Sequence, residues 1–287
     1  MPLPPPSDED RRRSIRLRRS TLTTLRLEGI DRPSITIATK GEDLLQAFRL
    51  VRQEYGRMGY IQGNGTYHFS VYNLLPETCV YVFKSYDTVI ASLTQVFDSP
   101  EFGLPMDSLY GEELDALRNR GRSVSELTCF VTSRDLRWRN LMTYLCKAMF
   151  VYSKQVGVDD LCIMVNPRHV PFYKRIFLFD DFGPERHYEQ VNAPAVALRI
   201  DMHDIDARLE EKYSGFAFET DLHTFFCRMH APSDAIVKGC APGRKNAALP
   251  TGMVRRLLGD SDSLRCQLSD EQSALLESLY PGVCFFD

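Results

Sequence analysis

The sequence lacks the features that mark several specialised classes of protein. Its 35 Lys and Arg nearly balance its 38 Asp and Glu, giving a formal net charge of −3, so charge alone gives no reason to expect a nucleic-acid partner. No apolar run approaches the ~18 residues of a transmembrane helix, and the N-terminus lacks the apolar core of a signal peptide. We therefore expect a cytoplasmic protein without a transmembrane segment.

The eight cysteines show no spacing that is typical of a metal site. None stands in a Cys-x-x-Cys pair, and no two histidines are spaced as metal ligands. Cys129 and Cys162 fall inside apolar strand patterns, where a reduced thiol packs as a small hydrophobic group. The sequence thus predicts no metal, no tightly bound cofactor and no disulfide framework, as is usual in a reducing compartment.

Strand and helix patterns alternate between residues 34 and 201. Strands are predicted at 35–37, 79–83, 89–97, 123–131, 161–165 and 191–200. Helical periodicity is predicted after a Thr39-x-x-Glu42 capping box, after a cap at Asp107-Ser108, over 138–152 and around Tyr173. This order predicts an α/β (α+β) fold, in which a mixed central sheet is flanked by helices on both faces.

The chain divides into three predicted regions. Residues 1–33 carry six arginines between Arg11 and Arg19 and form a flexible basic tail, which is either a solvated terminus or an arm for an acidic partner or anionic lipid. Residues 34–201 form the core. Residues 202–287 form a mostly helical extension: an apolar helix face at Leu222, Phe225, Phe226 and Met229, a loop over 237–252, and a helix capped by Ser269-x-x-Gln272.

Glu126 is the most informative acidic residue of the predicted core. It lies early in a predicted strand, where alternation would place it on one face with Thr128 and Phe130. A carboxylate on a central strand needs a partner when it is buried. It is therefore either a general base or anchor for an ammonium group, or half of a structural ion pair. The candidate ion-pair partners are Arg118, Arg120 and Arg122.

A second candidate site follows the strand at 161–165. Asn166 and Pro167 fit an N-cap and first helical residue, although Pro171 offers a later helix start. With a start at Pro167, His169 and Tyr173 are four residues apart and share a helix face. Ligands bind at the carboxyl ends of strands in open α/β sheets. His169 either contacts substrate or shapes the turn, and Tyr173 is either an acid or a core residue.

Three segments resemble one family. They are 125–131 (SELTCFV), 161–183 (LCIMVNPRHVPFYKRIFLFDDFG) with its NPRH turn at 166–169, and 103–107 (GLPMD) with Asp98-Ser99 upstream. Together they look like segments of the long-chain N-acyl amino acid synthases, a GNAT acyltransferase branch related to the acyl-homoserine lactone synthases. The resemblance covers roughly residues 34–201 and implies a bacterial GNAT enzyme of lipid chemistry. Its expected reaction moves a long-chain fatty acyl group from acyl carrier protein to the α-amine of an amino acid.

The resemblance also implies roles for individual residues. Glu126 would take a proton from the amine, Tyr173 would return one to the sulfur leaving group, and His169 would assist at the same site. Backbone N–H groups of three residues would hold the oxyanion: Cys129, Phe130 and Val131. The predicted acceptor site comprises Asp98, Asp107 and Asn166, with helix capping as the alternative for Asp107.

The segment 134–140 separates two possible acyl donors. Ordinary GNAT enzymes hold the coenzyme A pyrophosphate here on R/Q-x-x-G-x-G/A, whereas this chain has Arg134, Arg137 and Arg139, followed by Asn140. Glycine lets a backbone approach a pyrophosphate and arginine does not. We therefore expect the singly phosphorylated phosphopantetheine arm of acyl carrier protein as donor, with its acidic surface against these arginines, and acyl-CoA as the alternative.

Three other functions remain possible from the sequence. An acyl-homoserine lactone synthase would use S-adenosylmethionine, but the N-terminal tryptophan of that group is absent, since the sole tryptophan is Trp138. A coenzyme A-dependent GNAT acyltransferase would need a pyrophosphate cradle. A non-catalytic module that binds acyl carrier protein would need no acid or base. A peripheral membrane contact through the product or the basic tail is compatible with each function.

Overall fold

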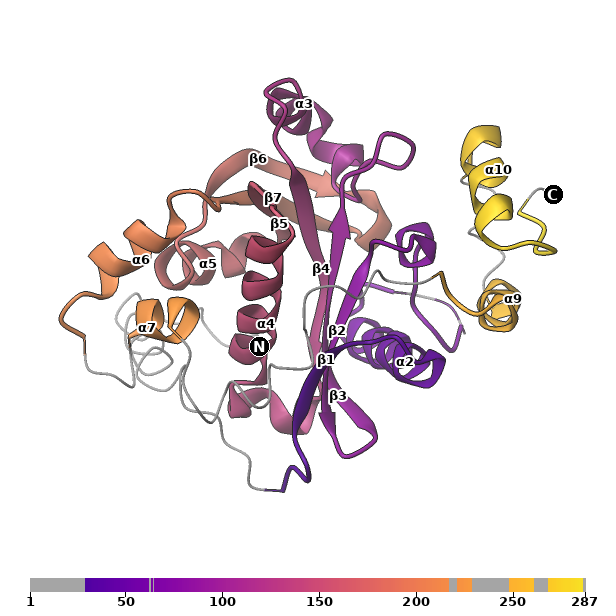
Figure 1. The fold of residues 1–287 in the computed structure, drawn as a ribbon, viewed down its shortest axis with the longest axis horizontal. Coiled ribbons are helices and arrows are strands. Elements are labelled where there is room, and N and C mark those ends of the chain that lie inside the picture. The colour runs from indigo at the N-terminus through magenta and orange to yellow at the C-terminus, as the bar shows by residue number, and fades with distance from the viewer. Residues whose placement is uncertain are drawn as a thin grey trace, which may run out of the picture.

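The computed structural model describes residues 29–61, 63, 65–216, 221–228, 248–260 and 268–285, with the backbone alone at 137–139 and 260. Its centre is a mixed seven-stranded sheet in the order β1-β2-β3-β4-β5-β7-β6 (Figure 1). The strands are β1 (Ser34–Ile37), β2 (Cys79–Ser85), β3 (Thr88–Phe97), β4 (Val124–Thr132), β5 (Asp160–Val165), β6 (Asp180–Tyr188) and β7 (Ala193–Asp201). Strands β4 and β5 are parallel, and the other neighbours are antiparallel.

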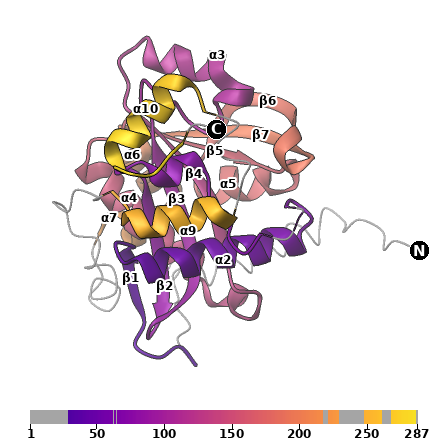
Figure 2. The ribbon, with the colours of Figure 1, turned by 90° about the vertical axis from the view of Figure 1, so that its right-hand side faces the viewer.

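Helices cover both faces of this sheet (Figures 1 and 2). One face carries α4 (Leu141–Gln155), α5 (Val170–Ile176), α6 (Ile205–Tyr213) and α7 (Leu222–Cys227). The other carries α2 (Gly41–Arg57), α3 (Asp107–Arg118), α9 (Thr251–Asp260) and α10 (Asp270–Leu279). Four 3₁₀ helices connect the elements: η1 (Val71–Leu74), η2 (Arg134–Arg139), η3 (Pro167–His169) and η4 (Glu189–Val191). The predicted fold class is confirmed.

Strand alternation divides the apolar core between the two faces. In β2, Tyr81 and Phe83 belong to the cluster under α4, whereas Val80 and Val82 belong to the cluster under α2. All four side chains are buried. A strand that is covered on both faces is apolar at almost every position, which explains the continuous hydrophobic runs in the sequence.

Strands β4 and β5 pair over part of their length only. Their register runs from Val124↔Asp160 to Leu127↔Ile163, whereas β4 stays paired with β3 as far as Thr132. The carboxyl-terminal half of β4 is therefore bound on one side by β3 and leaves β5 on the other. This divergence places the end of β4 and the turn after β5 at the same edge of the sheet, where ligands bind in α/β proteins.

One strand was not predicted from the sequence. Strand β6 lies at the sheet edge, pairs with β7 alone, and exposes much of its surface. Its composition is charged and includes Gly183 and Pro184, residues that are depleted in strands but tolerated at edges. An edge strand with one partner shows no two-sided apolar pattern, so residues 180–188 read as a loop.

The helix-start predictions had mixed outcomes. The Ser269 capping box is confirmed, with both reciprocal hydrogen bonds to Gln272 present. The Thr39 box is wrong, because α2 begins after Lys40 and has no side-chain cap. The predicted loop over 237–252 is wrong at its end, where α9 begins at Thr251, and residues 237–247 lie outside the described residues. Residues 1–28 and Met229 also lie outside them.

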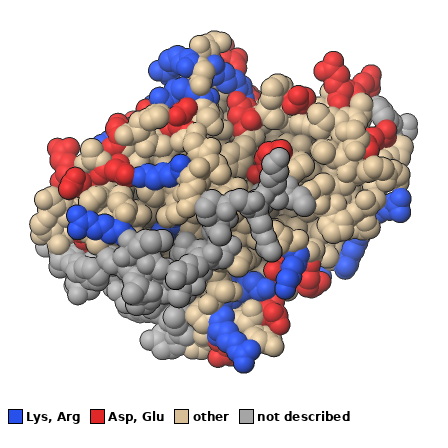
Figure 3. Space-filling model, viewed as in Figure 1, with Lys and Arg blue, Asp and Glu red and all other residues tan. Residues whose placement is uncertain are grey.

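The extension beyond the sheet is helical, as predicted. Helix α7 packs on α4 through Phe225 against Tyr144 and Phe226 against Phe150, with ring centroids 5.0 and 5.5 Å apart. In the described ranges, every helix is too short or too polar to span a bilayer. On the face that Figure 3 shows, described Lys and Arg side chains are interspersed with Asp and Glu.

Candidate active site

Glu126 is buried in the middle of β4, with 1% of its surface exposed. Its Oε2 accepts a hydrogen bond from the backbone N–H of Met106 at 2.7 Å. Burial disfavours the charged carboxylate and raises the pKa of Glu126 to about 8, against the opposing effect of the Met106 hydrogen bond and with an added contribution from the charge of Asp107. Near neutral pH this carboxyl can therefore take up and release a proton.

The predicted ion-pair alternative for Glu126 is wrong among the described residues. The three candidate arginines bind other groups: Arg118 binds Asp98, Asp107 and Asp115, Arg122 binds Asp160 and Asp201, and Arg120 donates to the carbonyl of Ala116. Within the ranges that the structure describes, Glu126 has no cationic partner. Buried carboxyls with a strongly raised pKa and no cationic partner are typical of functional sites.

The predicted common face of Glu126, Thr128 and Phe130 is wrong for Phe130. A β-bulge interrupts β4 at Cys129, which has a left-handed φ of 51°. The pairing register of β4 with β3 shifts at this point. Phe130 consequently packs with the apolar cluster under α4, whereas Glu126 contacts Met106 on the opposite face. The bulge therefore redirects the backbone of β4 where the strand departs from β5.

Two tyrosines that sequence reasoning missed border Glu126. Burial raises the pKa of Tyr188 to about 12 and raises the pKa of Tyr72 as well, and the charge of Glu126 adds to both shifts. Such an effect requires proximity. The Tyr72 hydroxyl also donates to the Phe102 carbonyl at 3.4 Å. Tyr72 lies in a short 3₁₀ helix and Tyr188 ends the unpredicted β6, so neither stands in a recognisable motif.

The Asn166–His169 turn forms as a capped 3₁₀ helix. Asn166 is its N-cap, and the side chain accepts the Arg168 N–H at 3.2 Å, which confirms the predicted cap. The helical segment begins at Pro167 as a 3₁₀ turn, and the α-helix α5 begins at Val170 with Pro171 in its first turn, so both predicted starts are present. His169 is exposed, and its Nε2 lies 3.1 Å from Arg168 Nε. These contacts of Asn166 and His169 lie within the turn itself.

Tyr173 lies in a cluster of aromatic rings on α5. Its ring centroid is 5.5 Å from that of Phe172 and 5.6 Å from that of Phe179, and the ring of Phe177 is 6.2 Å away. These three phenylalanines pack in the core cluster under α4. Burial raises the pKa of the Tyr173 hydroxyl, which therefore keeps its proton at neutral pH.

Tyr55 of α2 links the two predicted halves of the site. The pKa of Tyr55 is raised, and burial is the largest cause. Smaller electrostatic contributions in the same direction come from Cys129, Tyr173, Tyr60 and Tyr188. One phenol is thus within electrostatic reach of the β4 bulge and of the α5 tyrosine, which are 44 residues apart in sequence. The structure therefore brings Cys129 and Tyr173 to one region.

The Cys129 thiol is not an activated nucleophile. Burial raises its pKa to about 11, the Thr128 hydroxyl opposes this shift, and the charge of Glu126 adds to it. A protonated thiol reacts slowly, since the thiolate is the nucleophilic form. The arrangement at this position therefore favours direct transfer of an acyl group over a covalent cysteine intermediate.

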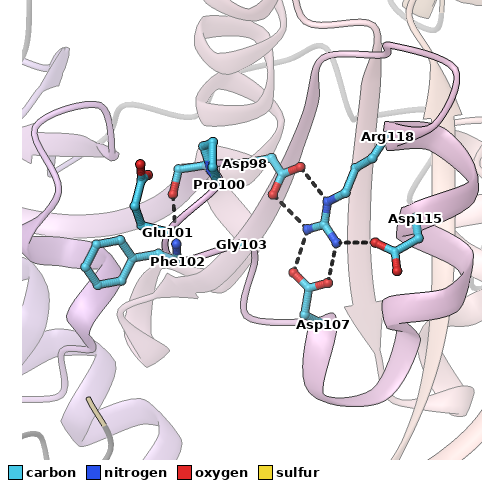
Figure 4. Close-up of a pocket in the computed structure, with 9 residues that line it drawn as sticks. Asp98, Pro100, Glu101, Phe102, Gly103, Asp107, Asp115 and Arg118 are labelled. Carbon is cyan, nitrogen blue, oxygen red and sulfur yellow. Dashed lines mark hydrogen bonds and ion pairs between the residues drawn. The ribbon is translucent and has the colours of Figure 1, made fainter. Parts of the chain in front are cut away.

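The predicted acceptor residues Asp98 and Asp107 are both bound by Arg118 (Figure 4). Four hydrogen bonds of 2.7–2.8 Å join the guanidinium to the two carboxylates. Asp107 also accepts the Leu104 N–H at 2.6 Å, so it closes the turn before α3 and does not cap the helix as predicted. These residues line an open hollow of about 630 Å³. Their charges are compensated by Arg118 at the end of α3, whereas no described cation pairs with Glu126.

The segment predicted to meet the donor lies between β4 and α4. Arg134 is exposed in η2, whereas the side chains of Arg137 and Arg139 lie outside the described residues. Asn140 has a left-handed φ of 59°, and α4 begins after it at Leu141. The first turn of α4 contains no acidic residue, so no carboxylate of that turn competes for its backbone N–H groups.

A family model named N-acyl amino acid synthase FeeM matches residues 46–201, more than half of the chain. The chain belongs to this family. It is an acyltransferase of the N-acyl amino acid synthase type. The solved structure of FeeM, from uncultured soil microbes, is 26% identical with a TM-score of 0.56, over 62% of this chain and 95% of that chain.

Two further structures are more distant from this FeeM-family chain. The coenzyme A-dependent acyl-homoserine lactone synthase BjaI is 16% identical with a TM-score of 0.46, over 63% of this chain and 88% of that chain. A putative N-acetyltransferase from Lactobacillus plantarum is 13% identical with a TM-score of 0.43, over 59% and 98%. Neither likeness bears on the donor. No curated protein matches the sequence.

Proposed function

We propose that this FeeM-family protein transfers a long-chain fatty acyl group from acyl carrier protein to the α-amine of an amino acid. The observation that carries the proposal is the buried carboxyl of Glu126, which has a pKa of about 8 and no cationic partner among the described residues. An acceptor ammonium group would supply the missing cation. N-acyl transfer requires that this group lose a proton before it attacks.

In the first step Glu126 takes a proton from the acceptor amine, directly or through a water molecule. The freed nitrogen lone pair attacks the thioester carbonyl carbon, a C–N bond forms, and the carbonyl π electrons move to oxygen. The developing oxyanion would be held by backbone N–H groups after the bulge: those of Cys129, Phe130 and Val131. One such donor contributes about 2.7–4 kcal/mol to the stability of a transition state.

In the second step the C–S bond breaks and sulfur leaves with its electron pair. A thiol with a pKa near ~8.5 is more acidic than a phenol near ~10, and burial raises the pKa of Tyr173 further. Complete proton transfer from Tyr173 to the thiolate is therefore uphill. This favours a role in which the Tyr173 hydroxyl donates a hydrogen bond to the leaving sulfur. As the C–S bond breaks, the oxyanion electron pair re-forms the carbonyl, the nitrogen releases its second proton to solvent, and the thiolate takes a proton from solvent.

The choice of acyl carrier protein rests on the arginines of 134–139. Exposed Arg134 stands ahead of α4, at a position where a glycine-rich pyrophosphate loop would be expected for coenzyme A. A phosphopantetheine arm presents one phosphate in place of a pyrophosphate. The acidic surface of a carrier protein would then pair with the same basic segment.

The test offers the purified protein long-chain acyl carrier protein or the matching acyl-CoA, each with the twenty amino acids. Mass spectrometry of the lipid fraction identifies the products. We expect N-acyl amino acids from the carrier-protein arm at far lower donor concentration than from the acyl-CoA arm. Folded protein that yields no N-acyl product from either donor contradicts the proposal, and product from acyl-CoA alone contradicts its donor.

A third arm with S-adenosylmethionine separates this function from acyl-homoserine lactone synthesis. Formation of an acyl-homoserine lactone in this arm would show that S-adenosylmethionine, and not an amino acid, is the acceptor. The Glu126→Gln variant serves as the control in every arm, because its amide oxygen still accepts the Met106 N–H but cannot act as a base.

A further inference from the structure

The FeeM-family match ends at residue 201, whereas the described chain continues through α6, α7, α9 and α10. The last two of these helices pack against each other through Val254 and Leu258 of α9 and Leu276 of α10. Both views place them on the α2 side of the sheet (Figures 1 and 2). In this cluster they enclose residues from two segments of the core, η1 and the loop 98–106.

The first connection runs from α10 to η1. Tyr280 is fully buried, its hydroxyl donates to the carbonyl of Leu74, and the same oxygen accepts the Leu249 N–H at 3.2 Å. Leu74 ends η1, the 3₁₀ helix that carries Tyr72. The position of Tyr72 thus depends on a segment that the end of α10 holds.

The second connection runs from α10 to the loop 98–106. Phe102 is buried in the cluster of α9 and α10, and Gln272 Nε2 donates to the carbonyl of Glu101 at 2.9 Å. The Tyr72 hydroxyl donates to the carbonyl of Phe102, which joins the two segments to each other. Four residues further along, Met106 donates its N–H to Glu126.

We propose that α9 and α10 form a positioning element for the acceptor half of the site. They hold η1 and the loop 98–106 so that the Met106 N–H stays on the Glu126 carboxyl and the Tyr72 hydroxyl stays on the Phe102 carbonyl. The inference rests on the proposed function, since it gives Glu126 the acceptor amine. Tyr280 and Gln272 act through other residues, and the groups that surround Glu126 belong to the core: Tyr72, Asp107, Cys129, Cys162 and Tyr188.

The chain offers two variants that remove a single connection each. Tyr280→Phe keeps the buried ring and loses both hydroxyl hydrogen bonds. Gln272→Glu keeps the acceptor that caps α10 through the Ser269 N–H, but it has no N–H to donate to Glu101. Ser278→Ala is the matched control, because its hydroxyl bonds to Leu275 within α10.

The experiment measures amide hydrogen exchange and kinetics on the full-length protein and these three variants. We expect faster exchange in peptides covering 98–107 and 70–76 for Tyr280→Phe and Gln272→Glu. The acceptor KM should rise by about threefold to tenfold, as for one lost hydrogen bond, while the donor KM stays unchanged. The pH midpoint of acceptor kcat/KM should move upward, since the Met106 N–H lowers the pKa of Glu126. Ser278→Ala should behave as wild type.

Three outcomes overturn or separate these claims. Unchanged exchange in 98–107 for both variants overturns the inference. Faster exchange with an unchanged acceptor KM and pH midpoint also overturns it, since α9 and α10 would then contribute stability alone. If the wild-type protein forms no N-acyl product, the proposed function fails. The exchange rate of the Met106 amide in the variants, compared with wild type, then still decides whether the two helices hold the loop.

Discussion

The backbone N–H of Met106 donates to Glu126 Oε2 at 2.7 Å across 20 residues of sequence. This bond joins the loop before α3 to the middle of β4. It lowers the pKa of a carboxyl that burial raises to about 8, so the loop contributes to the ionisation of the candidate base. The hydrogen bond is long-range, which makes the state of Glu126 sensitive to segments far from it in the chain.

Glu126→Gln tests the base role directly. The change keeps the size and hydrogen-bond acceptor of the side chain and removes its ability to take a proton. We expect turnover at saturating donor and acceptor to fall by about 10²–10⁴-fold, with little change in donor KM. Glu112→Gln is the matched control, because it makes the same change at an exposed position of α3. Turnover equal to wild type would remove Glu126 from the reaction.

The pH profile provides a second test of the same residue. A general base acts in its deprotonated form, so acceptor kcat/KM should rise with pH and level off above a midpoint near pH 8. A profile that is flat between pH 6 and 9, measured at saturating donor, would contradict the assignment.

Burial of Glu126 should also affect stability. Folding raises the pKa of Glu126, so the folded state binds this proton more tightly than the unfolded state does. The resulting contribution to the free energy of unfolding is fully present below the unfolded pKa and is lost as the pH rises through about 8. Glutamine does not ionise. Thermal melts should therefore show Glu126→Gln gaining stability over wild type between pH 5 and 9. A constant difference in Tm across this range would contradict the raised pKa.

Much of the fold follows from local sequence patterns. The strands near 79–83, 89–97 and 161–165 were predicted because they are buried on both faces and are therefore apolar throughout. The failures lie where the environment is one-sided. Strand β6 has one neighbour and an exposed surface, and α9 begins in a stretch of mixed composition whose apolar contacts, with α2 and α10, come from distant segments.

The candidate site was predictable only in part. Glu126 and Tyr173 stand in segments that resemble a known family, and a buried carboxyl has a chemical signature of its own. Met106 contributes a backbone N–H, which any residue type except proline supplies, so its sequence carries no signal. The bulge at Cys129 could not be predicted from the sequence either, because cysteine has no preference for a positive φ. Such features depend on tertiary closure.

Gly183→Ala tests the contact between β6 and α3. A Cβ at Gly183 would lie 2.4 Å from Cδ1 of Tyr110, whose hydroxyl oxygen lies 2.9 and 2.8 Å from two acceptors of its single proton, the carbonyls of Pro184 and Ala195. The ring is fixed from both ends, so we expect the free energy of unfolding to fall by about 1–3 kcal/mol in urea titrations.

The control substitution is at Gly111, next to Tyr110 on α3. Gly111 of α3 has space for a Cβ, with its nearest contact at 3.8 Å, so Gly111→Ala should raise the free energy of unfolding by roughly 0.5–1 kcal/mol. Equal effects of the two changes would show that helix propensity or strand composition, and not the contact with Tyr110, controls the result.

Arg134→Glu distinguishes the two donors. Arg134 is exposed ahead of α4, so reversing its charge should raise the KM for acyl carrier protein by about tenfold or more and weaken its dependence on salt. Acyl-CoA has no acidic protein surface, and its KM should change less. Lys212→Glu, an equal charge reversal at an exposed position of α6, should leave both KM values unchanged. Steady-state rates at two ionic strengths decide the matter, because a larger effect on acyl-CoA would place the pyrophosphate, and not a carrier protein, at this arginine.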